Sequence, residues 1–323
     1  MDKLVDWLLE GPPWVQYRTL IDLLDQPESN SEVAANRKAM LAHPKIRTLL
    51  SELSGWPGLS LKRHNDASHL LHKLVFISDL GIRSDDPGVG EIVKNIEEHQ
   101  SKEGAFQTLA NISPQYGGTG KDQLAWMLCD APSILYSLVK LSARENPVIQ
   151  TAAWHLASLS FDNGWPCTVA SELGKFRGPG RKTDPCPYAM LITLKALAQI
   201  PEWRDNRACS IGADTLLKLW EQRKERRPYM FAMGTDFAKL KAPLIWYDLL
   251  HVLEVLSQFP SLRKDRRFLD MVDVMKAKSD AEGRFTAESI WKAWSEWEFG
   301  QKKNPSFLIT LQVYRILKRI SQA

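Results

Sequence analysis

Asp184 and Cys186 stand two residues apart in the sequence Asp-Pro-Cys-Pro, directly before an apolar segment of helical period. A carboxylate and a thiolate at this spacing are both ligands that zinc accepts. The same stretch also suits a helix start, because Asp184 can accept a hydrogen bond from a free backbone N–H and Pro185 fits the first helical position. These residue types therefore leave two interpretations, a metal site or a helix cap.

A second polar group precedes another apolar segment and contains His64, Asp66, His69 and His72. His69 and His72 are three residues apart and share a helix face, and Asp66 stands three residues before His69. Such a group could hold a metal or transfer protons, and His69 is its candidate catalytic residue. Alternatively, Asp66 caps the helix and pairs with a histidine.

The elements that position these residues form a repeat. Apolar segments of helical period start about 60 residues apart, and the tetrapeptide Leu-Ile-Thr-Leu occurs at Leu191 and again at Leu308. The six predicted apolar helices start near Trp14, Asn65, Ala125, Pro185, Leu244 and Pro305. Amphipathic helices are predicted between them, over 31–53, 88–100, 147–159, 206–222 and 262–278.

The amphipathic segments end in related turns that combine glycine with an aromatic residue, such as Asp-Asn-Gly-Trp-Pro at Asp162 and Ala-Glu-Gly-Arg-Phe at Ala281. Helical hairpins of this kind cannot bury their apolar faces alone and must stack on one another. The sequence therefore predicts an all-α protein. Its expected architecture is a single α/α toroid over residues 1–323, with the apolar helices forming the inner layer.

Counted along the repeat, Asp130, Cys186 and Asp248 fall at nearly the same place in their copies. We therefore expect them at one level of the fold, with Asp130 and Asp248 as candidate catalytic carboxylates. Aromatic residues close to these positions are the candidate ligand-binding residues: Trp126, Tyr188, Trp246 and Tyr247. Polar and aromatic groups that converge at one level predict a pocket for a small molecule.

The period and the Gly-aromatic turns resemble the repeat of the prenyltransferase and squalene-cyclase superfamily, from about Trp14 to the end of the chain. The resemblance implies a central aromatic cavity that takes an apolar or isoprenoid-like molecule. Protein prenyltransferases of that superfamily bind catalytic zinc through an Asp-x-Cys and a histidine. By resemblance, Asp184 and Cys186 match the first element, and Asp248 occupies the histidine position with His251 three residues later.

Zinc is therefore the candidate cofactor, with Asp184, Cys186 and either His251 or Asp248 as its ligands. The chain departs from the superfamily elsewhere, because it carries neither the Asp-x-Asp-Asp acid nor the Asp-Asp-x-x-Asp magnesium motif of terpene cyclases. Cyclase activity is not predicted. Two other classes stay open: a binding protein without catalysis, and a carbohydrate-active toroid that uses Asp130 and Asp248 as paired carboxylates.

Three loops near the predicted helix starts are long, over 107–123, 168–184 and 231–243. Long loops often bind ligands, and basic residues such as Lys121, Lys175, Arg177 and Lys241 would attract an anionic group on the small molecule.

The overall composition limits the class of protein. Charged residues make up 25% of the chain and the formal net charge is only +4, so no nucleic-acid partner is predicted. The four cysteines form no Cys-x-x-Cys pair and no signal peptide is recognised, which predicts a cytoplasmic protein with free thiols. No stretch approaches the roughly 18 apolar residues of a membrane span, so no integral membrane segment is expected.

Overall fold

The computed structural model describes residues 2–142, 146–176, 183–224 and 236–322. Helices dominate these ranges, and the strands β1 (Thr108–Ala110) and β2 (Gln123–Ala125) form an antiparallel pair. The prediction of an all-α protein is confirmed at this level. The chain divides into two compact units, residues 52–232 and a unit made of residues 1–51 with 233–323. The single domain predicted over 1–323 stays a prediction.

All six predicted apolar segments are helices. In the 52–232 unit they are α5 (Leu70–Asp79), α7 (Ala131–Leu141) and α9 (Pro187–Leu197). In the other unit they are α2 (Pro13–Asp22), α12 (Leu249–Leu256) and α14 (Phe307–Ser321). All except α2 begin later than predicted, because the residues just ahead of each helix form turns, extended segments or, before α7, the end of strand β2.

The amphipathic segments are helices too: α3 (Ser31–Ala42), α4 (Pro44–Leu53), α6 (Val89–Glu97), α8 (Pro147–Ser158), α11 (Arg207–Glu221) and α13 (Arg266–Lys276). The prediction of one helix over 31–53 is wrong, since α3 ends at the extended residue His43. Pro44 lacks a backbone N–H and disfavours a helical conformation in the residue before it. Short helices α1 (Asp2–Leu9) and α10 (Pro201–Arg204) complete the set of α-helices in the described ranges.

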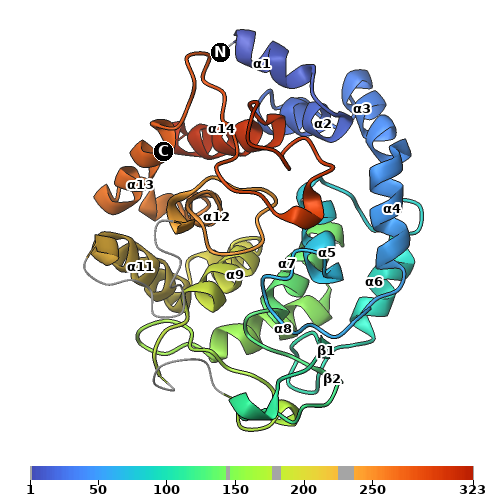
Figure 1. Ribbon diagram of the computed structural model, residues 1–323, viewed down its shortest axis with the longest axis vertical. Coiled ribbons are helices and arrows are strands. Elements are labelled where there is room, and N and C mark those ends of the chain that lie inside the picture. Colours follow the sequence, from blue (N-terminus) through green and yellow to red (C-terminus); the bar gives the residue numbers. More distant parts are fainter. Residues whose placement is uncertain (1, 143–145, 177–182, 225–235, 323) are drawn as a thin grey trace. The chain divides into compact units, whose positions relative to one another are not determined.

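In the 52–232 unit, α7 packs between α5 and α9, and α9 also contacts α8 and α11 (Figure 1). Every residue of α9 is buried. A helix that is buried all round must have neighbours on all of its faces, which is why its sequence is apolar without a polar stripe.

The Gly-aromatic turns fix where the next apolar helix begins. Gly164 has a φ of +100°, a conformation that favours glycine, and its turn is closed by a bridge between Phe161 and Gly164. The following Trp165 is fully buried, and its carbonyl oxygen accepts a hydrogen bond from the N–H of Cys186 at 2.7 Å. The turn at Gly283 repeats this arrangement, since the carbonyl of Phe285 accepts from the N–H of Ser306 at 2.8 Å.

A buried ion pair joins neighbouring apolar helices near their C-terminal ends. Lys195 of α9 lies with its Nζ 3.5 Å from the Asp79 carboxylate of α5 and 4.4 Å from the centroid of the Tyr136 ring of α7. The Tyr136 hydroxyl donates a hydrogen bond to the same carboxylate. This group ties α5, α7 and α9 together in one register.

In the ranges given above, no helix is both long enough and apolar enough to span a membrane.

Candidate functional site

The residues that immediately precede the apolar helices are polar in both units. His69, Asp130 and Cys186 stand directly before α5, α7 and α9, and Asp248 and Ser306 stand directly before α12 and α14. Sequence counting placed Asp130, Cys186 and Asp248 at corresponding positions, and each of them is the N-cap of its helix.

Cys186 and Asp248 cap their helices through their side chains. The Sγ of Cys186 accepts a hydrogen bond from the N–H of Ala189 at 3.3 Å, and Oδ1 of Asp248 accepts from the N–H of His251 at 2.9 Å. Ser306 does the same with the N–H of Ile309 at 3.2 Å. The convergence seen in the sequence therefore has a structural cause, because each apolar helix needs an acceptor for its first free N–H groups.

Asp184 is not the cap of α9, and the interpretation that gave it this role is wrong. Cys186 caps the helix and Pro187 occupies its first turn. The chain before Cys186 is extended, held by a bridge between Pro166 and Pro185 and by the bond from Cys186 to Trp165. Asp184 is thereby kept ahead of the first helical turn.

Asp66 does not cap α5 either. Its Oδ1 accepts hydrogen bonds from the N–H and hydroxyl of Ser68, and His69 is the cap, with its Nδ1 accepting from the N–H of Leu71 at 3.1 Å. The Nε2 of His69 is 2.9 Å from the carbonyl oxygen of Leu59. Both ring nitrogens of His69 are thus in hydrogen bonds that hold the start of α5, and its catalytic role stays a prediction.

Asp130 departs from this pattern, because its side chain makes no cap hydrogen bond. Its Oδ1 lies 2.9 Å from Nδ1 of His64, and the Asp130 side chain is 1% exposed while that of His64 is 26% exposed. Oδ2 of Asp130 is buried and finds no hydrogen-bond partner within the described ranges. A buried carboxylate that is not used for capping is available to orient a histidine.

The environment of His64 favours its charged form. Burial lowers the pKa of His64, but the charge of Asp130, the hydrogen bond to Asp130 and the nearby Cys167 outweigh burial and raise it above its ordinary value. His72 shows the opposite shift, because burial lowers its pKa to about 4. The Nε2 of His72 donates to the carbonyl oxygen of His64 at 2.8 Å, so His72 helps to hold the backbone of His64 in place.

Three thiols interact with one another beside this pair, and Cys167 also acts on His64. Hydrogen bonds with Cys167 and Cys186, together with burial, raise the pKa of Cys129 well above its ordinary value. Burial raises the pKa of Cys186 to about 12, whereas Cys167 is partly exposed. The two buried thiols are therefore protonated at neutral pH, and Cys167 is the thiol within reach of solvent.

Tyr188 belongs to the same group. Burial, then the charge of Asp130, then Cys129 and Cys186 raise the pKa of its phenol. We call His64, Cys129, Asp130, Cys167, Cys186 and Tyr188 the thiol–imidazole cluster. Trp126, predicted to bind the same ligand, packs edge-on against His155 of α8, with ring centroids 5.0 Å apart, and its ligand-binding role stays a prediction.

The remaining predicted residues lie in the other unit. Asp248 is buried, and burial raises its pKa to about 7 against the opposing effects of the His251 N–H and Lys241. His251 directs Nδ1 to the carbonyl oxygen of Trp246 at 2.8 Å. Burial raises the pKa of Tyr247. Asp248 and Trp246 are therefore both hydrogen-bonded to His251 in the first turn of α12.

The four predicted zinc ligands are divided between the units, with Asp184 and Cys186 in one and Asp248 and His251 in the other. Among the residues that the structure describes, no three histidine, cysteine or acidic side chains are arranged to hold a metal ion. Zinc binding stays a prediction.

Each of the three predicted loops contains a described segment of regular structure, with the 3₁₀ helices Ser171–Leu173 in the second and Asp236–Ala238 in the third. The loop over 107–123 carries β1, and Lys241 places its Nζ 3.3 Å from the centroid of the Trp291 ring. Arg177 lies outside the described residues. Lys241 therefore packs on an aromatic face, where its cation is already in favourable contact.

Sequence reasoning placed Asp130, Cys186 and Tyr188 in one site, and the structure brings them together. It placed His64 in a separate candidate group with Asp66, His69 and His72, and it did not select Cys129 or Cys167. Cys129 is adjacent to Asp130, and Cys167 follows the turn whose Trp165 binds the N–H of Cys186. Its position two residues after the tryptophan of a Gly-aromatic turn is the sequence signal that points to Cys167.

Comparisons with known proteins name no function. No family model and no curated protein matches the sequence. A solved structure, described as the crystal structure of a protein from Actinoplanes, resembles the chain with a TM-score of 0.41 and 13% sequence identity, over 96% of this chain and 90% of that chain. A similarity of this size carries no argument about the function.

Proposed function

We propose that the chain is a prenyltransferase- and cyclase-like α/α toroid that binds a small apolar molecule with an anionic group at the thiol–imidazole cluster. In this proposal the six apolar helices form the inner layer and the amphipathic helices the outer one. The complete burial of α9 supports an inner position for that helix. The amphipathic helices α6, α11 and α13, which bury one face each, suit an outer layer.

One observation carries the proposal: the His64–Asp130 pair sits with three thiols at the N-terminal ends of α5, α7 and α9. Helix N-termini carry partial positive charge, and the raised pKa of His64 favours its positively charged form. An anionic group on a ligand is therefore favoured here. The apolar helices that lead away from this end suit the apolar remainder of such a ligand.

The pair also suits general acid chemistry. Because Nδ1 of His64 is held by Asp130, Nε2 is the nitrogen left to exchange a proton with a ligand. His64 would give that proton to an oxygen of the anionic group and regain one from solvent. Asp130 would hold the ring in one orientation and stabilise the imidazolium, as a buried carboxylate does for a catalytic histidine.

Binding can be tested with farnesyl diphosphate and farnesol, which share an apolar chain and differ in the anionic group. We expect calorimetry to detect the diphosphate more strongly than the alcohol, and His64→Gln to weaken the diphosphate roughly tenfold without changing the alcohol. His99→Gln is the matched control, since His99 bonds to Asn95 within its own helix region. Equal binding of both probes, or of neither, would refute the proposed site.

Turnover separates an enzyme from a binding protein. Incubation of the wild-type chain with farnesyl diphosphate and with a thiol or hydroxyl acceptor, followed by mass spectrometry, is expected to give product at a rate that falls as pH rises through the pKa of His64. Binding without product at any pH would leave a ligand-binding protein.

The zinc prediction is tested by the metal content of protein purified without added metal. Cys186→Ser keeps the cap acceptor of α9 and removes the thiol, and Cys209→Ser is the control because Cys209 is equally buried outside the cluster. About one zinc per chain, lost only in Cys186→Ser, would support a metalloenzyme. Metal-free wild-type protein would end the zinc prediction and leave the His64–Asp130 proposal intact.

A further inference from the structure

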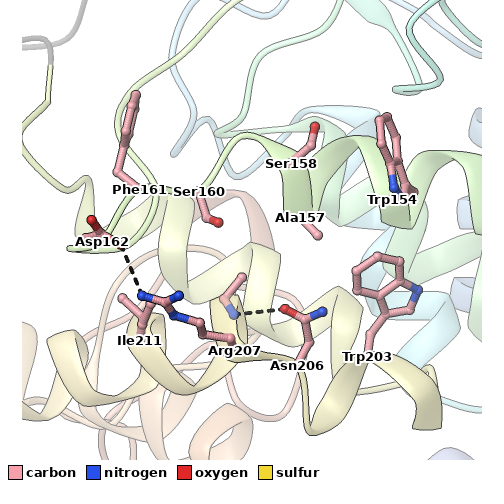
Figure 2. A pocket seen from close by; sticks show the side chains of 11 residues that line it. Trp154, Ala157, Ser158, Ser160, Phe161, Asp162, Trp203, Asn206, Arg207 and Ile211 are labelled. Atoms are coloured by element: carbon pink, nitrogen blue, oxygen red, sulfur yellow. Dashed lines mark hydrogen bonds and ion pairs between the residues drawn. The ribbon is translucent and has the colours of Figure 1, made fainter.

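A groove in the 52–232 unit lies apart from the thiol–imidazole cluster and shares no residue with it. It has a volume of about 550 Å³, within the range of roughly 300–1,000 Å³ that small-molecule sites occupy. Residues of α8, the turn after α8, α10 and α11 line it. Figure 2 shows Trp154 and Trp203 at one end of the groove and Phe161, Asp162 and Arg207 at the other.

The aromatic rings of this groove are unusually exposed. Trp154 is 64% exposed and Phe161 is 47% exposed. Trp154 lies on the exposed face of α8, opposite the face that carries the buried residues of this helix. Neither Trp154 nor Trp203 stacks on another ring within the described ranges. An exposed indole beside a second, partly exposed one at the end of a groove is costly to leave in water, which points to a ligand that covers them.

Polar groups without full partners face the same groove. Asn206 uses its Oδ1 to cap α11 by accepting from the N–H of Ala208 at 2.8 Å, which leaves its NH₂ group for a ligand. Arg207 and Asp162 form an ion pair at 3.4 Å with side chains 84% and 96% exposed, so water competes for both. The groove thus offers hydrogen-bond donors and acceptors together, and these two charges cancel.

This combination selects among ligands. A purely apolar ligand would strip water from Asn206, Arg207 and Asp162 without replacing it, at a cost of about 1–3 kcal/mol for each group. A strongly anionic ligand would meet the Asp162 carboxylate, and a cationic one the Arg207 guanidinium. A pyranose ring fits both features, since its C–H face covers an indole while its hydroxyl groups donate to a carboxylate and accept from amide and guanidinium N–H groups.

We infer that the groove between α8 and α11 is a binding site for a neutral oligosaccharide, with Trp154 and Trp203 as stacking platforms and Asn206, Arg207 and Asp162 binding hydroxyl groups. The site is independent of the chemistry proposed at the thiol–imidazole cluster. It places a glycan on α8, α10 and α11.

The test is a titration of the full chain with maltotriose, cellotriose, xylotriose, mannotriose and tri-N-acetylchitotriose, followed by tryptophan fluorescence and calorimetry. We expect at least one of them to bind with millimolar or tighter affinity. Trp154→Ala should weaken binding roughly tenfold or more. Asn206→Asp, which keeps the cap acceptor and removes the NH₂ donor, should weaken it several-fold.

Tyr116→Ala is the matched control, because Tyr116 is also 64% exposed in the same unit but lies outside the groove. The inference is overturned if none of the five trisaccharides binds in the millimolar range, or if Trp154→Ala binds as the wild type does. It is also overturned if decaproline, the alternative occupant of an aromatic groove, binds where the trisaccharides do not.

Discussion

His64 and Asp130 show how a pair of residues acquires properties that neither has alone. Burial by itself would lower the pKa of His64, and the buried Asp130 reverses the shift. Asp130 in turn has no cap hydrogen bond, so the histidine is its main described partner. The pair is the chemical centre of the thiol–imidazole cluster.

Asp130→Asn is therefore expected to lower the pKa of His64 below 6.5, because the effect of burial remains when the negative charge is removed. The measurement is a titration of the His64 ring by NMR. Asp85→Asn, an exposed acidic residue of the same unit, is the control and should leave the His64 titration in place. An unchanged pKa in Asp130→Asn would show that the pair does not set the charge of His64.

His72 makes the structure sensitive to acid. Its pKa is lowered from 6.5 to about 4 in the folded chain, so the stability that comes from keeping it neutral is present above pH 6.5 and is lost as the pH falls towards 4. The loss is at most about 3 kcal/mol, from 1.36 kcal/mol for each pKa unit. His72→Gln retains a donor for the carbonyl of His64 and cannot gain the proton.

We expect urea unfolding to show that the wild type loses stability between pH 7 and pH 4.5 relative to His72→Gln. His99→Gln serves as the control for replacing a histidine elsewhere in the unit. Parallel pH dependence of the wild type and His72→Gln would contradict this role of His72.

At the scale of elements, the Gly-aromatic turns connect one helical hairpin to the next. A Cβ added to Gly164 would lie 2.4 Å from Sδ of Met190 in α9, and the φ of +100° is itself unfavourable for other residues. Gly88 has a similar φ of +82°, but a Cβ there would meet nothing within 4 Å. A substitution at Gly88 therefore tests backbone strain alone, whereas one at Gly164 tests backbone strain together with a steric clash.

Gly164→Ala is expected to cost about 3 kcal/mol and Gly88→Ala about 1 kcal/mol in the free energy of unfolding. Urea unfolding of both variants measures the difference. Because the turn at Gly164 positions Trp165, which binds the N–H of Cys186, Gly164→Ala should also disturb the thiol–imidazole cluster. Equal costs for the two variants would mean that the contact with Met190 is relieved without loss.

At the scale of the whole chain, a partly buried ionic network joins segments that are far apart in sequence. Glu254 of α12 accepts hydrogen bonds from Arg319 of α14 at 2.9 and 3.0 Å. Arg315, also of α14, reaches Glu254 at 3.6 Å and Asp22 of α2 at 3.2 Å. The network fixes the first apolar helix of the chain against the last one within a single unit.

Glu254→Gln is expected to destabilise the chain by about 2–3 kcal/mol, because it leaves two arginines with reduced compensation in a partly buried site. Thermal or urea unfolding checks the value. Asp214→Asn breaks the exposed pair with Lys218 and should change stability by less than about 0.5 kcal/mol. A cost for Glu254→Gln as small as that of Asp214→Asn would show that the network adds specificity but little stability.

The residues by themselves determined the helical class, the six apolar helices and the position of Asp130, Cys186 and Asp248 at the starts of their helices. These features follow from local spacing, since a 3.6-residue period and a regular repeat are properties of the sequence. The helix starts were less predictable, because Asp184 and Cys186 are both acceptable caps. The choice depends on the bond from Cys186 to Trp165, about 20 residues earlier in the chain.

Only the tertiary structure decided which polar residues act together. Nothing in the spacing of His64 and Asp130 predicts that they meet, or that Cys129, Cys167 and Cys186 share hydrogen bonds. The groove lined by Trp154 and Trp203 was equally hidden, because exposure depends on what packs against a helix face. Local spacing determines the helices, whereas contacts between distant segments set the burial, charge and partners on which chemistry depends.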